Sequence, residues 1–285
     1  MSRLAQRYRG RVAAITGAGS GIGRALAHQL AGLGCHLALS DVNQASVEAV
    51  AAELAEHDVR ITTAAVDVAN KAQVQQWAES TAAELGAVHF IFNNAGVAMG
   101  SPIDGMSDDD LRWLMDIDFW GVVYGTQAFL PYLKQTGEGH VVNVSSIFGL
   151  IGVPSQGAYN AAKFAVRGYT EALRQELDIA RSGASATSVH PGGIKTNIAQ
   201  AARFTDNMAS MGASDVDESK ARFSKLFITT PEKAADVILR GVARNARRVL
   251  IGPDAYAVDA MQRLLPTTYQ RLVAAGARRL MQNSD

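Results

Sequence analysis

The chain has 285 residues, of which 48% are hydrophobic and 19% charged, a composition that suits one large α/β core. Lysine plus arginine equals aspartate plus glutamate at 27 each, so the charge balance gives no reason to expect a nucleic-acid partner or an anionic membrane surface. Cys35 is the only cysteine, which excludes an intrachain disulfide and a cysteine metal cluster.

Signals for targeting and for membrane spans are also missing from the sequence. The apolar run near the basic N-terminus is too short for a signal-peptide core, and no apolar stretch reaches the roughly 18 residues of a membrane span. We therefore expect a reduced, cytoplasmic protein without integral membrane association and without a metal site. Cys35 is expected to be a small buried hydrophobe in a strand.

A glycine-rich turn follows the first predicted strand, residues 12–15. The turn reads TGAGSGIG at residues 16–23, and apolar residues after it recur at helical spacing up to Leu33. Glycines let the backbone approach a pyrophosphate, and the start of the helix offers free N–H groups and a partial positive charge. A flexible loop is the alternative, which the strand before and the helix after disfavour. The residues expected to contact a nucleotide here are Gly17, Ser20, Gly21, Ile22 and Gly23.

The second predicted strand, residues 37–40, ends in Asp41. An acidic residue at this distance from the glycine-rich turn suits a hydrogen bond to a ribose 2′-hydroxyl, and it would repel a 2′-phosphate. No arginine or lysine stands at positions 40, 42 or 43 to accept such a phosphate. NAD is therefore favoured over NADP. The alternative role of Asp41 is to cap the next helix, predicted over residues 43–57.

Strands and helices alternate along the rest of the chain. The further predicted strands are residues 59–66, 88–92, 140–144, 186–189 and 248–251. This alternation implies right-handed βαβ units and a parallel sheet, and such sheets bind ligands at their carboxyl edge. Asn93-Asn94-Ala95-Gly96 follows a strand and is expected at that edge.

A carboxylate interrupts the apolar face of the next predicted helix, which begins after Ser107 with three aspartates. The apolar stripe of this helix carries Leu111, Leu114, Met115, Val122 and Phe129, and Asp118 lies on the same stripe. Because an unpaired carboxylate on an apolar face is costly, Asp118 is a candidate site residue. A structural aspartate bonded to neighbouring backbone is an equally favoured alternative.

The pair Tyr159 and Lys163 lies on a helix predicted over residues 156–181, where i and i+4 share one face. A lysine ammonium there is expected to lower the tyrosine pKa from its ordinary value near ~10, so that the tyrosine can act as a general acid or base. Ser146, at the end of a predicted strand, could supply a hydroxyl to the same reacting oxygen. Such pairs are common on helix surfaces, and the nucleotide-binding start of this chain favours a site.

Two late segments have weaker patterns. Residues 192–229 carry scattered apolar side chains and suggest a mobile substrate lid. Residues 253–285 form a helical extension interrupted at Pro266, with several arginines. This extension could be an oligomer contact or a weak membrane-surface helix, although ordinary packing is favoured. No second domain is expected.

Together these motifs resemble the short-chain dehydrogenase/reductase family over roughly residues 8–252. The likeness is carried by TGAGSGIG at 16–23, Asn93-Asn94-Ala95-Gly96, Ser146, Tyr159 with Lys163, and Pro191-Gly192. The resemblance implies a single-domain Rossmann fold, an α/β doubly wound seven-stranded parallel sheet with helices on both faces. It also implies hydride transfer between a nicotinamide and an alcohol or carbonyl, and a homodimer or homotetramer paired through helices near 107–135 and 156–182.

The resemblance further implies roles for individual residues. Lys163 would contact the nicotinamide ribose, while Ser146 and Tyr159 would bind the substrate oxygen. The remaining cofactor contacts would come from Asp67 and Val68 near the adenine, Asn94 along the cofactor, Pro191 beside it, and Ile194 and Thr196 by the carboxamide. The family usually has asparagine where this chain has Asp118, and that asparagine positions a water in the proton path. A charged Asp118 could bias the lysine and shift the pH profile.

The leading hypothesis is an NAD-dependent oxidoreductase acting on a secondary alcohol or its ketone. An NADP-preferring carbonyl reductase and a nucleotide-binding regulator without turnover are the alternatives. The residues expected to flank the substrate are apolar, which favours an apolar or bulky alcohol. They are Val97, Met99, Phe148, Leu150 and Val153.

Overall fold

The computed structural model describes residues 3–205 and 227–282 of the chain. Most of the predicted substrate lid, residues 206–226, therefore lies outside the described residues. None of the helices within the described ranges is long and apolar enough to cross a membrane.

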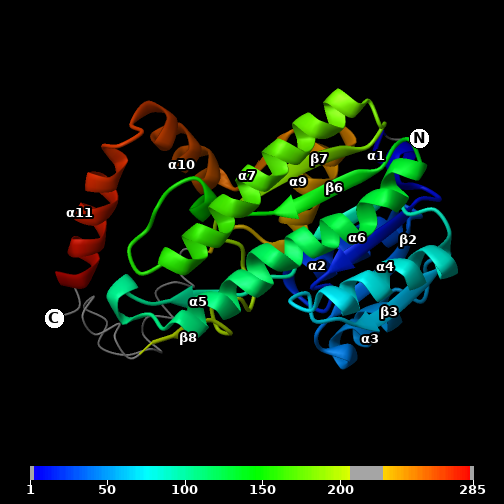
Figure 1. The fold of residues 1–285 in the computed structure, drawn as a ribbon, viewed down its shortest axis with the longest axis horizontal. Helices are drawn as coiled ribbons and strands as arrows, with labels where there is room; N and C mark the ends of the chain where they lie inside the picture. The colour runs from blue at the N-terminus through cyan, green and yellow to red at the C-terminus, as the bar shows by residue number, and fades with distance from the viewer. Residues whose placement is uncertain (1–2, 206–226, 283–285) are drawn as a thin grey trace.

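A seven-stranded parallel sheet forms the centre of the molecule (Figure 1). Its strands are β1 (Val12–Thr16), β2 (His36–Asp41), β3 (Ile61–Ala65), β4 (Phe90–Asn93), β6 (His140–Val144), β7 (Ser185–Pro191) and β9 (Arg248–Ile251). They lie in the order β3-β2-β1-β4-β6-β7-β9, and every neighbouring pair is parallel. The order reverses between β1 and β4, which is where open parallel sheets bind ligands. The predicted seven-stranded doubly wound sheet is confirmed.

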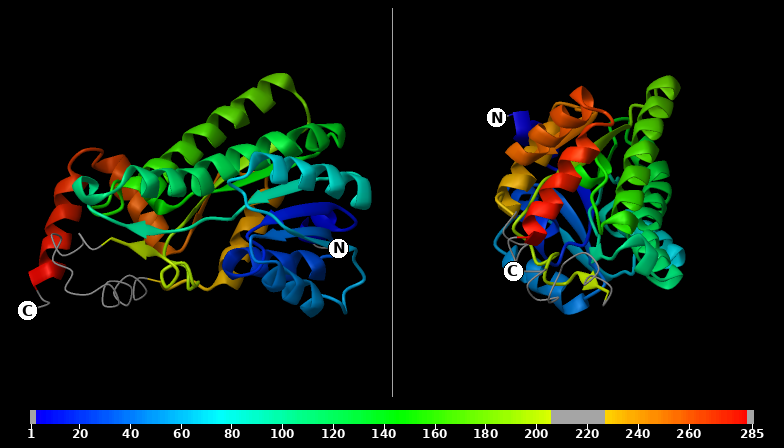
Figure 2. Two further views of the ribbon diagram at one scale, coloured as in Figure 1. Left: turned by 60° about the horizontal axis from the view of Figure 1, so that its bottom comes forward. Right: turned by 90° about the vertical axis from the view of Figure 1, so that its left-hand side faces the viewer.

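Helices cover both faces of this sheet (Figure 2). One face carries α2 (Gly21–Gly32), α3 (Gln44–Glu53) and α9 (Pro231–Ala243), with the short α1 (Arg3–Tyr8) packed against α9. The other face carries α4 (Lys71–Leu85), α6 (Gly121–Gln135) and α7 (Gly157–Ala180). Because both faces are covered, β1, β4, β6 and β7 are buried along their whole length. β1, β4 and β6 consist largely of apolar residues, whereas β7 carries buried serine, threonine and histidine side chains.

Several boundaries differ from those predicted. The third and fourth strands are shorter, and the helix predicted over 43–57 is α3, which ends at Glu53. Cys35 is buried as expected, but it lies one residue before β2 instead of inside it, where its N–H donates to the Leu30 carbonyl of α2. These differences arise where helix ends and turns satisfy their backbone groups locally, which apolar periodicity does not reveal.

The helix predicted from Ser107 onward is not continuous. It consists of α5 (Asp108–Met115), a π-helical turn at Asp116–Trp120 (η2) and α6. Ser107 caps α5 by accepting the N–H of Asp110. Leu111, expected on the apolar stripe, is 38% exposed, whereas Leu114, Val122 and Phe129 are buried. The extra residue of the π-turn shifts the helical phase between α5 and α6, so a strict helical stripe that fits Val122 and Phe129 does not fit Leu111.

Smaller elements surround the carboxyl edge of the sheet. They are β5 (Met99–Gly100), which pairs with β8 (Arg203–Phe204), the short turns η1 (Ile103–Gly105) and η3 (Ile147–Gly149), and the C-terminal α10 (Pro253–Leu264) and α11 (Tyr269–Gln282). The interruption predicted at Pro266 is present between the last two helices. The hydroxyl of Tyr269 accepts the N–H of Gly152, so α11 starts beside the loop that leads into α7 (Figure 1).

Helix α6 crosses β4 closely at Gly125. A Cβ at this position would collide with the Asn93 side-chain oxygen. The Asn93 amide donates to Thr126 and Asn143, and Asn143 donates to Thr170, so buried hydrogen bonds join β4, β6, α6 and α7. The absence of a side chain at Gly125 allows this network to form.

We expect Gly125→Ala to lower the free energy of unfolding by about 1–3 kcal/mol, the usual cost of overpacking a filled core. Gly168→Ala on α7 is the matched control, because a Cβ there meets no atom within 4 Å. The control should be neutral or stabilising by about 0.5–1 kcal/mol. Urea denaturation measures both, and equal effects of the two substitutions would show that the α6–β4 contact tolerates a methyl group.

Candidate active site

The carboxyl ends of β1, β4, β6 and β7 place the sequence-predicted residues along one edge of the sheet. The glycine-rich loop begins at Thr16, the end of β1, and Gly17 has a φ of 64°. A Cβ on Gly17 would lie 2.8 Å from the Ala95 Cα, because the loop packs against the segment after β4. A side chain at this position is therefore excluded both by the backbone conformation and by space.

Asn94 holds the glycine-rich loop against the end of β4. Its side-chain amide donates to the carbonyls of Thr16 and Gly17 at 2.9 and 3.2 Å, and its own N–H donates to the Thr16 hydroxyl. The resemblance placed Asn94 along the cofactor. In the structure the Asn94 amide is bonded to the glycine-rich loop, which is the loop that would bind the cofactor.

Helix α2 starts within this loop. Its N-cap residue, Ser20, makes no side-chain capping bond, and no acidic residue lies in the first turn. The first N–H groups of the helix therefore remain available to an anion, which is the arrangement that dinucleotide-binding folds use for pyrophosphate. Thr196 lies beside this loop, since a Cβ on Gly21 would be 3.0 Å from the Thr196 methyl carbon. The loop after β7 thus faces the glycine-rich loop. These residues fit a dinucleotide.

Asp41 ends β2 next to the same loop. Its carboxylate accepts the N–H of Gly19 at 3.0 Å and the N–H of Asn43 at 3.1 Å. The alternative role of capping the next helix belongs to Asn43, whose side chain accepts the N–H of Ser46 at the start of α3. The carboxylate of Asp41 is therefore held at the glycine-rich loop.

The other predicted cofactor residues lie in the loops after β3 and β7. Asp67 is exposed and its carboxylate accepts the N–H of Ala69, while Val68 is buried. Pro191 ends β7, and Ile194 is buried and forms a β-bridge with Thr229. All of these positions lie at the carboxyl edge of the sheet, although Asp67 follows the strand at its border.

Tyr159 and Lys163 lie on the first two turns of α7. The Lys163 ammonium is buried and lies 5.4 Å from the centroid of the Tyr159 ring. Ser146, which follows β6, is buried, and its hydroxyl accepts the N–H of Phe148. It lies close enough to the Tyr159 phenol to lower the pKa of that group. The structure therefore brings together the three side chains that the sequence singled out.

Asp118 is fully buried in the π-turn η2. One carboxylate oxygen lies 3.0 Å from the Lys163 ammonium, and the other accepts the N–H of Val97 at 2.7 Å. The ammonium also lies 3.4 Å from the Val144 carbonyl at the end of β6. Asp118 therefore pairs with a buried charge and also binds the backbone of Val97, so its carboxylate is not left unpaired.

The electrostatics of these groups are coupled. Burial raises the pKa of Tyr159, the Lys163 ammonium lowers it, and the Asp118 carboxylate raises it again. The lysine therefore acts on this pKa in the predicted direction, but the net direction is upward because burial outweighs the ammonium.

Lys163 and Asp118 form the buried ion pair beside this phenol, and each shifts the pKa of the other. Burial lowers the pKa of Lys163, but the carboxylate of Asp118 and the hydroxyl of Tyr159 raise it, and the net shift is upward. Burial raises the pKa of Asp118, with the ammonium of Lys163 opposing it. The lysine is therefore held in its charged form.

Two polar residues that the sequence analysis did not single out shape the site. The amide of Asn160 donates to the carbonyls of Phe148 and Ile151, and its oxygen accepts the N–H of Val153. The hydroxyl of Ser145 donates to the Lys163 carbonyl at 2.8 Å. Both residues are neighbours of predicted site residues, but only the folded backbone shows which carbonyls need a donor.

Of the apolar residues expected to flank the substrate, Val97, Met99 and Phe148 lie beside Tyr159. Met99 and Leu150 are buried, and the Phe148 ring meets the Tyr159 ring edge-on at 5.9 Å. Val97 and Val153 are half-buried. Among the residues described, no group of three or more histidine, cysteine, aspartate or glutamate side chains is arranged to hold a metal ion.

Known proteins share both this sequence pattern and this fold. A family model described as short chain dehydrogenase matches residues 11–207. The chain belongs to the short-chain dehydrogenase family. SadH of Mycobacterium tuberculosis, a protein named as an oxidoreductase, is 46% identical over 274 residues, covering 94% of this chain and 96% of that protein.

Solved structures agree with the family assignment. A short-chain dehydrogenase/reductase from Burkholderia phymatum, in complex with NAD, has a TM-score of 0.83 at 31% identity, covering 90% of this chain and 94% of that one. An alcohol dehydrogenase from the archaeon Thermococcus sibiricus, complexed with 5-hydroxy-NADP, has a TM-score of 0.70 at 23% identity, covering 85% and 95%, a likeness of fold. This short-chain dehydrogenase is thus an NAD(P)-dependent oxidoreductase acting on CH–OH groups.

Proposed function

We propose that this chain uses NAD to oxidise an apolar secondary alcohol, or NADH to reduce the ketone, with Tyr159 as general base or acid. The observation that carries the proposal is the juxtaposition of the Tyr159 and Ser146 hydroxyls in front of the buried Lys163 ammonium. This group lies at the same edge of the sheet as the glycine-rich loop, since Ser146 follows β6 and only β4 separates β6 from β1.

The residues that would hold the ends and the pyrophosphate of NAD come from the carboxyl end of β2 and from the loops after β1 and β7. The pyrophosphate would lie on the N–H groups at the start of α2, and the adenosine ribose beside the Asp41 carboxylate. Thr196 and Ile194 would border the nicotinamide end, since their loop faces the glycine-rich loop. When bound, NAD supplies the nicotinamide ring that accepts a hydride from the alcohol carbon.

The protein's own groups would handle the proton. In the oxidation direction Tyr159, as phenolate, takes the proton of the substrate hydroxyl, and the Ser146 hydroxyl donates a hydrogen bond to the same oxygen. The Lys163 ammonium stabilises the phenolate, because it is held in its charged form by Asp118. The reverse reaction returns the proton from Tyr159 to the ketone oxygen.

The substrate class follows from the surroundings of Tyr159. The Phe148 ring packs edge-on against the Tyr159 ring, Met99 belongs to the same apolar cluster as Tyr159, and Tyr269 from α11 lies against the loop at Gly152. A charged group placed among these side chains would lose its hydration without gaining a partner. We therefore propose an apolar aliphatic, aryl or steroid alcohol.

Tyr159→Phe is expected to lower kcat by about 10²–10⁴-fold while leaving the dissociation constant of NAD within about twofold, because only the proton-transfer group is removed. The assay follows NADH formation with a panel of 2-octanol, 1-phenylethanol, cyclohexanol and a 3-hydroxysteroid. Tyr169→Phe is the matched control, since Tyr169 lies on the same helix and packs against Phe119. Parental turnover in Tyr159→Phe would contradict the mechanism. NAD binding without turnover of any panel alcohol would favour a regulator.

Asp41 is expected to set the cofactor preference. The parent should bind NAD at least about tenfold more tightly than NADP, because a 2′-phosphate beside a carboxylate costs on the order of a kcal/mol or more. Asp41→Ala should reduce this ratio, mainly by tightening NADP, whereas Glu48→Ala on the exposed side of α3 should not. Calorimetric titration of both nucleotides provides the measurement, and tighter binding of NADP by the parent would reverse the assignment.

The proposed assembly is a homodimer or homotetramer. Trp120, Phe164 and Leu111 are 42%, 40% and 38% exposed on neighbouring elements, η2, α7 and α5, which supports pairing through these helices. Light scattering at micromolar concentration should give at least twice the 30.2 kDa of the chain, and a monomer would exclude this assembly. The cytoplasmic location stays a prediction.

A further inference from the structure

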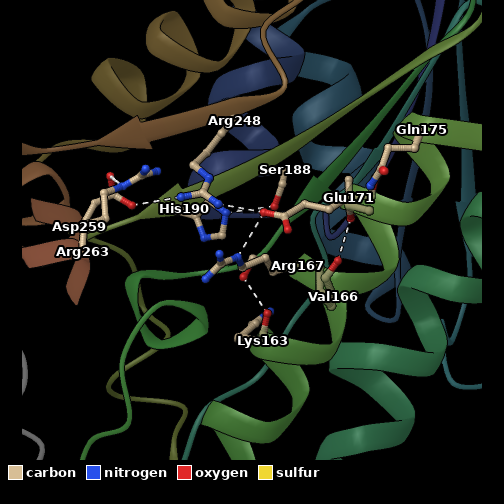
Figure 3. Close-up of polar contacts among 12 residues, drawn as sticks. Lys163, Val166, Arg167, Glu171, Gln175, Ser188, His190, Arg248, Asp259 and Arg263 are labelled. Carbon is tan, nitrogen blue, oxygen red and sulfur yellow. Dashed lines mark hydrogen bonds and ion pairs between the residues drawn. The ribbon is translucent and has the colours of Figure 1, made fainter. Parts of the chain in front are cut away.

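His190 is a fully buried polar residue to which the proposed chemistry assigns no role. It lies on β7, next to the end of β6, and its side chain points toward the segment that carries Ser146. The ring nitrogen Nδ1 is 3.0 Å from the backbone carbonyl oxygen of Ser146. The other ring nitrogen, Nε2, is 2.9 Å from the Ser188 hydroxyl (Figure 3).

These two contacts determine the tautomer of the ring. The carbonyl oxygen of Ser146 can only accept a hydrogen bond, so Nδ1 must carry the proton. Nε2 is then an acceptor, and the Ser188 hydroxyl must donate to it. Burial lowers the pKa of His190 to about 4, with the Ser146 carbonyl opposing it and the cations of Arg248 and Arg167 adding to it. The ring is therefore neutral at physiological pH and binds as a fixed donor.

The charges around His190 are themselves paired. Arg248 lies 2.7 Å from Glu171 and 2.9 Å from Asp259, and Arg167 lies 3.1 Å from Glu171 (Figure 3). Glu171 belongs to α7, Arg248 to β9 and Asp259 to α10, so this network joins the helix of Tyr159 to the C-terminal part of the fold. The described surroundings of His190 thus satisfy their own charges and leave its ring bound to the two serines.

The Ser146 carbonyl matters because it belongs to the short turn that carries the Ser146 hydroxyl. One flank of this turn is held by the Ser145 N–H, which donates to the Val189 carbonyl of β7. The other flank is held by the Asn160 amide of α7, which donates to the Phe148 carbonyl.

The Ser146 hydroxyl accepts the N–H of Phe148, and the carbonyl accepts the N–H of Gly149 within the same turn. These bonds fix the turn internally. The bond from His190 adds a side-chain contact from β7 to the backbone of Ser146 itself, and so bears on where the Ser146 hydroxyl lies relative to Tyr159.

We propose that His190 is a positioning residue that orients the Ser146 hydroxyl toward the substrate oxygen by holding the Ser146 backbone to β7. This inference rests on the proposed function, in which Ser146 binds that oxygen. A displacement of a reacting group by about 1 Å can cost on the order of 100-fold in rate, so a buried hydrogen bond behind the group can affect catalysis without touching the substrate.

A double-mutant cycle with Ser146→Ala tests the inference. His190→Leu should lower kcat by about 10- to 100-fold in the parent but by less than about twofold in Ser146→Ala, where no hydroxyl remains to be positioned. His190→Asn keeps a donor near the Nδ1 position and should recover most of the rate. The dissociation constant of NAD and the thermal midpoint are measured for each variant, with the panel alcohol that the parent oxidises fastest as substrate.

The outcomes separate the two claims. Equal loss of kcat from His190→Leu in both backgrounds would overturn the positioning role while leaving the proposed function intact. Parental kcat in Ser146→Ala would overturn the proposed function, and the inference with it.

If His190→Leu does not fold, Ser188→Ala replaces it in the cycle, with a smaller loss of kcat expected in the parent only. NMR of the imidazole nitrogens of the parent protein measures the tautomer of His190 independently of the kinetics. It should show His190 as the Nδ1–H tautomer, and an Nε2–H tautomer would contradict the proposed bond.

Discussion

A buried positive charge governs the arrangement of this site. The Lys163 ammonium is removed from water at the carboxyl edge of the sheet, and such a charge is tolerated only if carboxylate and carbonyl oxygens replace its hydration. Asp118 and the Val144 carbonyl provide those oxygens. The second carboxylate oxygen of Asp118 binds the Val97 N–H, so the same pair also fixes the loop after β4. Breaking the pair would leave an uncompensated charge beside Tyr159.

The π-turn at Asp116–Trp120 carries the Asp118 carboxylate. It widens the helix between α5 and α6 and places Asp118 against α7. Short-chain dehydrogenases usually have a neutral asparagine here, and this chain adds a negative charge. That charge raises the pKa of both Lys163 and Tyr159. The ammonium that favours the phenolate is therefore partly offset by its own counter-ion, and burial moves the pKa of Tyr159 further upward.

Much of the fold was predictable because its signals are local. A strand, a glycine-rich turn and a helix follow one another at residues 12–33. Helical spacing alone places Tyr159 and Lys163 on one face of the same helix. The contacts that depend on tertiary packing were not predictable in this way. Residues 116–120 contain no proline or glycine that would distinguish the π-turn from an ordinary helix. Nothing in the sequence near His190 indicates that its ring meets the Ser146 carbonyl.

The central claim is that an ionised Asp118, through Lys163, sets the proton affinity of Tyr159. Ultraviolet difference titration of tyrosinate, with Tyr159→Phe subtracted, measures the pKa of this phenol directly in the parent and in Asp118→Asn. The account predicts a lower pKa in Asp118→Asn, because the substitution removes a negative charge that disfavours the phenolate. Alcohol oxidation, which needs the deprotonated phenol, should then rise at lower pH. An unchanged or higher phenol pKa in Asp118→Asn would contradict the account.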